Sequence, residues 1–149
     1  MVIGIVLDAD TGVDRRWASI RAKLRDHSYQ FPDVPDENGT IIDAQEPLPK
    51  LGVWLMPNNQ TRGMLEDFCL EMIEQRARET AGTAVVDAQR KGVCTFQAAH
   101  LSKAIVHTYL AWQDEPGRPL GQAITTQALR PLTQTARAFT DWLTRLFAI

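Results

Sequence analysis

Two aspartates near the start of the chain, Asp8 and Asp10, are the residues best suited to chemistry. They follow residues 2–7, an apolar run rich in β-branched side chains that predicts a strand buried on both faces, as in a parallel sheet. In a strand, residues two apart point to the same side, so both carboxylates should project together. Two neighbouring carboxylates repel each other unless a cation lies between them. The pattern therefore predicts a site for Mg²⁺ or Mn²⁺, which oxygen ligands of this kind suit.

The same two aspartates also allow an interpretation without a metal. One of them could cap the following helix while the other faces water, since aspartate is a common capping residue. Their place at the carboxyl end of a strand favours the metal, because open α/β sheets bind ligands there.

A second acidic segment, residues 57–67, contains a polar loop with a glycine and then a helix that opens with Glu66 and Asp67. Backbone N–H groups of such a loop could face a phosphate, and Glu66 could reach the same metal. Acids in a first helical turn also complement the helix dipole without any further function. Taken alone, this segment favours a structural role.

Lys103 lies between His100 and His107 at helical spacing. The two histidines are poorly spaced for zinc bound by a single helix, and no cysteine is near. A solvated helix face is the simpler interpretation, although Lys103 could place a positive charge beside a scissile phosphate. The first helix carries a basic cluster that is either a solvated face or a phosphate-contact patch beside Asp10. Its members are Arg15, Arg16, Arg21, Lys23 and Arg25.

Composition narrows the class of partner. The 149 residues carry a net charge of −2, so any contact with nucleic acid must come from a local patch or a bound cation. No segment is apolar for long enough to cross a bilayer and nothing resembles a secretory signal, which predicts a cytoplasmic, bacterial-type protein without a membrane partner. Cys69 and Cys94 lie far apart in apolar segments and are expected to be buried free thiols.

Hydrophobic patterning predicts strands first and helices later. Strands are expected at residues 2–7, 40–44 and 51–56, and helices at residues 14–24, 64–73, 80–90, 96–112, 122–129 and after Pro131. We expect one α/β domain, residues 1–149, with a partial parallel sheet flanked by helices and a helix-rich C-terminal half. Because the elements do not alternate evenly from the first residue, a βα unit is expected to be missing at the front, or the sheet to be completed by something else.

Two helices carry expectations about individual side chains. Asp14 is expected to cap the first helix, in which Trp17, Ile20 and Leu24 recur at helical spacing. The last helix is expected to gather its apolar side chains on one face. That face comprises Leu132, Ala136, Phe139, Leu143 and Leu146.

Taken together, these features resemble the catalytic half of a Toprim domain, the metal-binding fold of topoisomerases, primases and OLD-family nucleases. The chain is similar to a Toprim-related bacterial family of unknown function, through the segments IVLDAD, GVWLMPNNQTRGMLEDF, SKAIVHTYLAWQDEPGRPLGQAI and FTDWLTRLF. The resemblance implies a Toprim-like, Rossmann-like fold in which Asp8 and Asp10 are the DxD metal pair. It also implies that Glu66 is the later metal-binding glutamate of OLD-type nucleases and that Lys103 is the lysine on a downstream helix.

The chain departs from the Toprim pattern at its start. A Toprim domain carries its first glutamate on a strand–helix unit before DxD, whereas this sequence has six residues before Leu7. We therefore expect an N-terminally incomplete domain. Residues 2–7 should then form an exposed apolar edge that pairs with a second copy or with an upstream polypeptide.

The expected function is Mg²⁺-dependent phosphodiester cleavage or transfer on nucleic acid or a nucleotide. Asp8, Asp10 and Glu66 would hold the cation, and Lys103 would stabilise charge on the phosphoryl oxygens. The alternative is a non-catalytic Toprim remnant that binds a phosphate ligand or a protein partner. The missing glutamate leaves open whether the isolated chain is an enzyme, and the two hypotheses differ in whether any cation supports cleavage.

Overall fold

Three strands, six helices and two short 3₁₀ turns make up the chain in the computed structural model, which describes residues 1–149. They fall into two compact units: Met1–Leu65 with Gln134–Ile149, here called the sheet unit, and Glu66–Thr133, here called the helical unit. None of the helices is both long and apolar enough to span a membrane.

The sheet unit contains all three strands. Its elements are β1 (Val2–Asp8), α1 (Val13–Leu24), a 3₁₀ turn (Arg25–His27), β2 (Thr40–Ile42), β3 (Lys50–Met56) and α6 (Gln134–Phe147). The helical unit contains α3 (Gln75–Arg90), a 3₁₀ turn (Ala98–His100), α4 (Leu101–Ala111) and α5 (Leu120–Thr125). The short helix α2 (Leu65–Leu70) begins at the last residue of the first segment of the sheet unit.

The strands form one sheet in the order β1-β3-β2. β1 runs parallel to β3, from Val2 opposite Lys50 to Asp8 opposite Met56, and β2 runs antiparallel to β3. The expected mixture of strands and helices is confirmed. The sheet itself is mixed, and the prediction of a parallel sheet is wrong for β2, because the link between β2 and β3 is too short for the crossover that parallel strands need.

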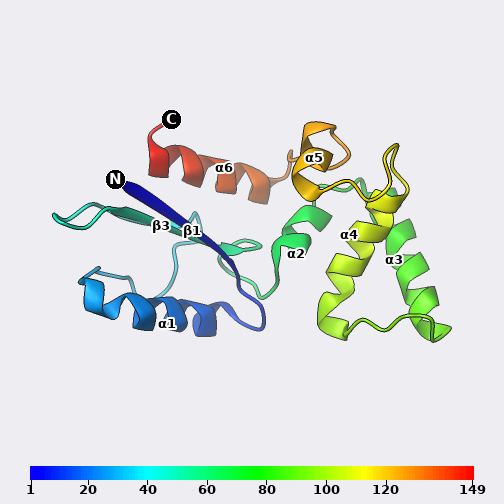
Figure 1. Ribbon diagram of the computed structural model, residues 1–149, viewed down its shortest axis with the longest axis horizontal. Helices are drawn as coiled ribbons and strands as arrows, with labels where there is room; N and C mark the ends of the chain where they lie inside the picture. Colours follow the sequence, from blue (N-terminus) through cyan, green and yellow to red (C-terminus); the bar gives the residue numbers. More distant parts are fainter. The chain divides into compact units, whose positions relative to one another are not determined.

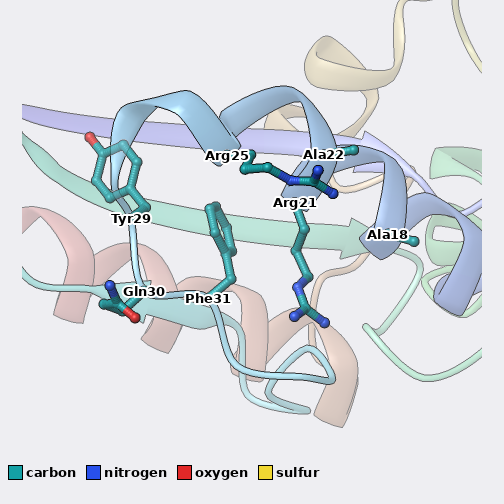
Figure 2. Close-up of a pocket in the computed structure, with 7 residues that line it drawn as sticks. All are labelled: Ala18, Arg21, Ala22, Arg25, Tyr29, Gln30 and Phe31. Carbon is teal, nitrogen blue, oxygen red and sulfur yellow. The ribbon is translucent and has the colours of Figure 1, made fainter.

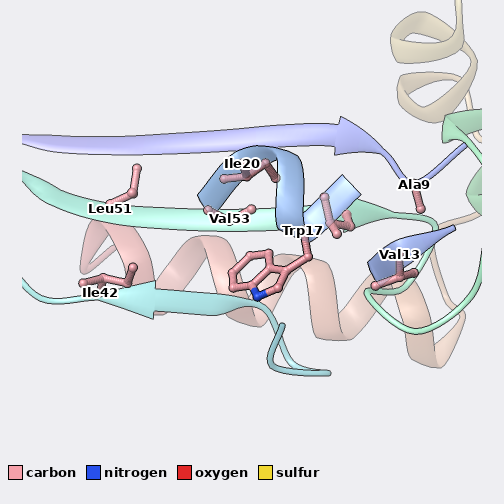
Figure 3. Packing of buried hydrophobic residues seen from close by; sticks show 8 residues of the cluster. Ala9, Val13, Trp17, Ile20, Ile42, Leu51 and Val53 are labelled. Atoms are coloured by element: carbon pink, nitrogen blue, oxygen red, sulfur yellow. The ribbon is translucent and has the colours of Figure 1, made fainter. Parts of the chain in front are cut away.

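The central strand β3 is buried because helices cover both faces of the sheet, α1 on one and α6 on the other (Figure 1). On the α1 face, Leu51 and Val53 pack with Trp17 and Ile20 in the cluster drawn in Figure 3. On the α6 face, Gly52 lets the helix approach so closely that a Cβ at this position would lie 2.8 Å from Leu146 Cδ1. The apolar run of β3 thus reflects a strand enclosed on both faces.

β1 lies at the edge of the sheet, and the prediction that it is buried on both faces is wrong. Val2, Ile3, Val6 and Leu7 each expose between 37% and 43% of their surface. The strand order is the reason, because β1 has a neighbouring strand on one side only. Its other edge presents an apolar strand with unpaired main-chain groups.

Helix α1 forms where hydrophobic spacing predicted it, with Val13, Trp17 and Ile20 buried. Asp14 does not cap it, and that prediction is wrong: Gly12 occupies the N-cap position without a capping side chain. Asp14 lies one residue inside the helix, in its first turn, where its charge complements the helix dipole.

The face of α6 differs in part from the expected one. Ala136 and Leu146 are buried as predicted, whereas Leu132 precedes the helix and is 71% exposed, so it is wrongly assigned to the face. Trp142, which hydrophobic spacing had not singled out, is fully buried and lies 5.8 Å from the Trp54 ring between centroids. The two tryptophans therefore join α6 to the sheet.

In the helical unit, α3 and α4 pack against each other. Buried side chains on the two helices include Ala81 and Val85 of α3 and Val106 and Leu110 of α4. α3 begins five residues before the expected start at residue 80. Its N-cap is Glu74, whose carboxylate accepts hydrogen bonds from two backbone N–H groups at 3.1 Å, and these bonds lower the pKa of Glu74.

Candidate functional site

Asp8 is the last residue of β1 and is held in place by the neighbouring backbone. Its main chain pairs with Met56 at the end of β3, and its Oδ1 accepts a hydrogen bond of 2.8 Å from the N–H of Leu65. The parallel pairing of β1 and β3 therefore brings Asp8 to the carboxyl edge of the sheet. This is the edge at which α/β sheets bind ligands.

Asp10 lies outside β1, and the argument from strand alternation does not apply to it. Its φ of 52° is left-handed, a conformation that aspartate adopts more readily than most residues. Two backbone hydrogen bonds to Gly63, of 2.8 and 3.0 Å, hold it there. The prediction that both carboxylates project from one face of a strand is thus wrong. It assumed that Asp10 belongs to the strand, whereas the chain leaves the strand at the buried Ala9.

The carboxylate of Asp10 already has a cationic partner. Its Oδ2 accepts a hydrogen bond from the guanidinium of Arg16, on the first full turn of α1. Both side chains are partly exposed, 33% for Arg16 and 47% for Asp10, so solvent weakens the pair. Oδ2 of Asp8 and Oδ1 of Asp10 accept no hydrogen bond, and these two oxygens are the ones that could ligate a cation.

No group of three or more histidine, cysteine, aspartate or glutamate side chains is placed to hold a metal ion. The predicted ligands belong to different units, Asp8 and Asp10 to the sheet unit and Glu66 to the helical unit. The fit to a cation therefore rests on the two aspartates, whose hard carboxylate oxygens are of the kind that Mg²⁺ binds while it keeps several waters. The role of Glu66 as a third ligand stays a prediction from the sequence.

The helical unit brings together the other two predicted residues, Glu66 and Lys103. Nζ of Lys103 on α4 lies 3.4 Å from Oε1 of Glu66 on α2. The Glu66 side chain is only 11% exposed, whereas Lys103 is 55% exposed and reaches solvent. His100 and His107 are exposed as well, as expected for a solvated helix face. The arrangement places a positive charge at the surface beside a buried carboxylate.

Two neighbours complete the surroundings of Glu66. Asp67 accepts a hydrogen bond from the hydroxyl of Ser102, which ties α2 to α4 a second time. Cys69 is 2% exposed, and burial, together with the negative charge of Glu66, raises the pKa of its thiol to about 11. The prediction of free thiols is confirmed for both cysteines; Cys69 is buried and Cys94 only partly so.

The raised pKa of Cys69 predicts a slow reaction with alkylating reagents. At pH 8 only about one Cys69 thiol in a thousand is the reactive thiolate. We expect iodoacetamide to modify the partly exposed Cys94 first and Cys69 only after unfolding, as measured by peptide mass spectrometry. Because the folded-state pKa lies above the unfolded value of 9.0, stability should also fall as the pH rises from 9 towards 11. Equal labelling of both cysteines in the native protein would contradict this account.

The sequence did not predict one candidate binding site, a cavity beside α1. The cavity beside the C-terminal half of α1 joins Arg21 and Arg25 to Tyr29 and Phe31. The basic cluster was visible in the sequence, but the two aromatic residues stand in a segment without periodicity. Only the folded chain brings them next to the arginines.

Comparison with known proteins identifies a family for the chain. No protein of curated function and no solved structure matches the chain. A family model, described as a protein of unknown function (DUF3226), matches residues 1–148. The chain therefore belongs to the DUF3226 family.

Proposed function

We propose that the chain carries out Mg²⁺-dependent phosphodiester cleavage or transfer on nucleic acid, through a Toprim-like metal site at Asp8 and Asp10. The observation that carries the proposal is the carboxyl edge of the sheet, where Asp8 ends β1 and Asp10 follows two residues later. Each keeps one carboxylate oxygen without a hydrogen bond. The parallel pair β1–β3 with α1 on one face and α6 on the other supports a Toprim-like fold.

In this proposal the residues of the sheet unit bind and orient the phosphate. A divalent cation, when bound, supplies polarisation of the phosphate and a more acidic bound water. The Leu65 N–H restrains the Asp8 carboxylate through Oδ1, which leaves Oδ2 for the cation. Arg16 is already paired with Asp10 and offers further N–H donors to a phosphoryl oxygen.

Glu66 and Lys103 enter the proposal from the sequence, as a further metal ligand and as the group that stabilises charge on the phosphoryl oxygens. Their contact at 3.4 Å supports a shared role. The Lys103 side chain is exposed to solvent, and the buried Glu66 restrains its position.

Plasmid nicking tests the proposed activity. We expect the chain to convert supercoiled plasmid to open circles with Mn²⁺ or Mg²⁺, to stop in EDTA, and to lose the activity in Lys103→Gln. The exposed Lys91→Gln is the matched control, because it removes the same charge from the same unit. An unchanged plasmid under every cation would overturn the proposal.

The alternative function, a non-catalytic module that binds a phosphate ligand or a protein, also has an observation in its favour. Arg16 already neutralises Asp10, and Lys103 already neutralises Glu66, so the acidic groups are partly satisfied without a metal. This alternative predicts a melting temperature that does not change with Mg²⁺ or Mn²⁺, together with no cleavage.

The ion pair between Arg16 and Asp10 predicts a substitution that raises the affinity for Mn²⁺ instead of lowering it. Arg16 and a dication compete for the same carboxylate and repel each other. Arg16→Gln should therefore tighten Mn²⁺ binding by about five- to tenfold, since the local positive charge is removed. Isothermal titration calorimetry measures the affinity, with Arg15→Gln on the same helix as the control. Weaker binding in Arg16→Gln alone would contradict a cation at Asp10.

We also propose that the free edge of β1 pairs with β1 of a second copy. A two-fold axis perpendicular to the sheet makes the two strands antiparallel and places the second strand beside the exposed Val6 and Leu7. We expect light scattering to give twice the chain mass of 16.7 kDa, and Val6→Lys to give the single mass. A monodisperse monomer of the unsubstituted chain would rule this pairing out.

A further inference from the structure

We propose that a cavity of the sheet unit binds one nucleotide unit, with the phosphate on arginine and the base on an aromatic ring. The cavity has a volume of about 410 Å³, within the range of about 300–1,000 Å³ common for small-ligand sites. Its lining consists of Ala18, Arg21, Ala22, Arg25, Tyr29, Gln30 and Phe31 (Figure 2). The cavity would bind the nucleic acid on which the proposed metal site acts. Only the view that this nucleic acid is a substrate rests on the proposed function.

Helix α1 forms one wall of the cavity through its residue spacing. Ala18, Arg21, Ala22 and Arg25 lie three or four positions apart and so share one face of the helix and the turn that continues it. The two alanines leave open space, and the two arginines border it. Trp17 lies on the adjacent, buried face of α1, where it contacts Phe31 of the opposite wall.

The opposite wall, residues 29–31, is fixed by hydrogen bonds at several points. The Trp17 indole N–H donates to the carbonyl of Pro32 at 3.0 Å, and the Tyr29 hydroxyl donates to the carbonyl of Pro49 at 3.0 Å. Arg21 donates to the carbonyl and carboxylate of Asp33 at 3.2 and 3.3 Å. A wall that is already ordered loses less entropy when a ligand binds.

The charge of the cavity favours an anion. No acidic side chain lines it. The Arg25 side chain is exposed and makes no hydrogen bond or ion pair, so all its donors are free for a phosphate. Arg21 has one acidic partner, Asp33, whose side chain is 96% exposed and which therefore neutralises it weakly. Two guanidinium groups can together surround a phosphate by several N–H donors.

The aromatic residues favour a planar group on the same ligand. Phe31 meets Trp17 at 5.6 Å and 78°, and Tyr29 at 6.2 Å and 68°, both in edge contacts. Tyr29 and Phe31 are half-buried against the core cluster, so each ring keeps only part of its surface towards the cavity. Figure 2 shows the Phe31 ring between Tyr29 and Arg21. A base can stack on such a ring whatever its identity. Gln30 adds an amide for the polar edge of the base.

Fluorescence anisotropy with a 5′-labelled octathymidylate in EDTA tests the site. We expect Arg25→Gln to weaken binding about five- to tenfold, and to reduce the slope of log affinity against log salt by about 0.7. Phe31→Leu, which keeps an apolar side chain, should weaken binding about tenfold. The matched control is Arg15→Gln, an exposed arginine on α1 outside the cavity, which should change the affinity less than twofold.

Competition distinguishes the two sources of the ligand. Displacement by thymidine monophosphate within tenfold of the oligonucleotide affinity identifies a free nucleotide, whereas a difference above a hundredfold identifies a strand. Displacement by inorganic phosphate as effective as by the nucleotide would overturn the site, because the ring would then contribute nothing. Equal losses in Arg25→Gln and Arg15→Gln, or no binding by the unsubstituted chain, would overturn it as well.

The experiment is independent of the proposed catalysis. Because EDTA removes divalent cations, binding can succeed while plasmid nicking fails, and the cavity then stands without the metal site. If Arg25→Gln keeps both plasmid nicking and the unsubstituted oligonucleotide affinity, the cavity is overturned and the proposed catalysis stands.

Discussion

Replacing Asp8 with asparagine is expected to reduce Mn²⁺ affinity at least a hundredfold and to remove plasmid nicking. Asparagine has the same shape and keeps an oxygen that can accept the hydrogen bond from the Leu65 N–H. The fold should therefore be retained, while the charge that binds the cation is lost. Isothermal titration calorimetry measures the affinity, and circular dichroism confirms the fold.

A matched control separates this effect from the loss of negative charge in general. Asp14→Asn removes the same charge from the first turn of α1, a few residues away in sequence. It should change Mn²⁺ affinity by less than threefold. If Asp8→Asn binds Mn²⁺ as tightly as Asp14→Asn does, Asp8 is no ligand.

Replacing Gly39 with alanine is expected to destabilise the sheet unit by about 3 to 5 kcal/mol, from a strained backbone and an overpacked core together. Gly39 has a φ of 86°, and a Cβ there would overlap the ring of Trp142. The ring cannot move aside, because it is fully buried and its Nε1 donates to the carbonyl of Thr40 at 3.2 Å. It is also stacked on Phe139, with centroids 5.7 Å apart.

Urea unfolding followed by tryptophan fluorescence measures this loss. Gly12→Ala is the control in the same unit, since its φ of 176° suits any residue and a Cβ there would meet no atom within 4 Å. Because Gly12 is the N-cap of α1 and alanine caps helices less well than glycine, that variant should lose no more than about 1 kcal/mol. Similar midpoints for the two variants would show that Trp142 does not pack as described.

Hydrophobic patterning predicted the strands and helices of the sheet unit, but not which strands pair or which side chains pack together. An apolar run such as residues 2–7 has the same composition whether it lies at the centre or at the edge of a sheet. β1 lies at the edge because β3 pairs with both other strands, and these pairings join residues about fifty positions apart for β1. Trp142 was missed for a similar reason: its burial depends on Trp54, which is distant in sequence.

The candidate site was predicted to a different extent in each unit. The place of Asp8 at a strand end was predicted from the apolar run before it and is found in the fold, whereas its role as a metal ligand stays a prediction. The conformation of Asp10 depends on its bridge to Gly63 and could not be derived from local spacing. The approach of Lys103 to Glu66 was implied only by the resemblance to Toprim proteins, since the two residues lie 37 positions apart in the chain. Long-range contacts of this kind are not encoded in helical or strand periodicity.

Electron paramagnetic resonance of Mn²⁺ tests the central claim, a cation at Asp8 and Asp10, most directly. Free Mn²⁺ gives a sharp six-line spectrum that is lost when the ion is bound by carboxylates. We expect the unsubstituted chain to remove one Mn²⁺ per chain with a dissociation constant of about 10⁻⁴ to 10⁻³ M, as for weak carboxylate sites. A free-ion signal that is undiminished at millimolar protein would contradict the account.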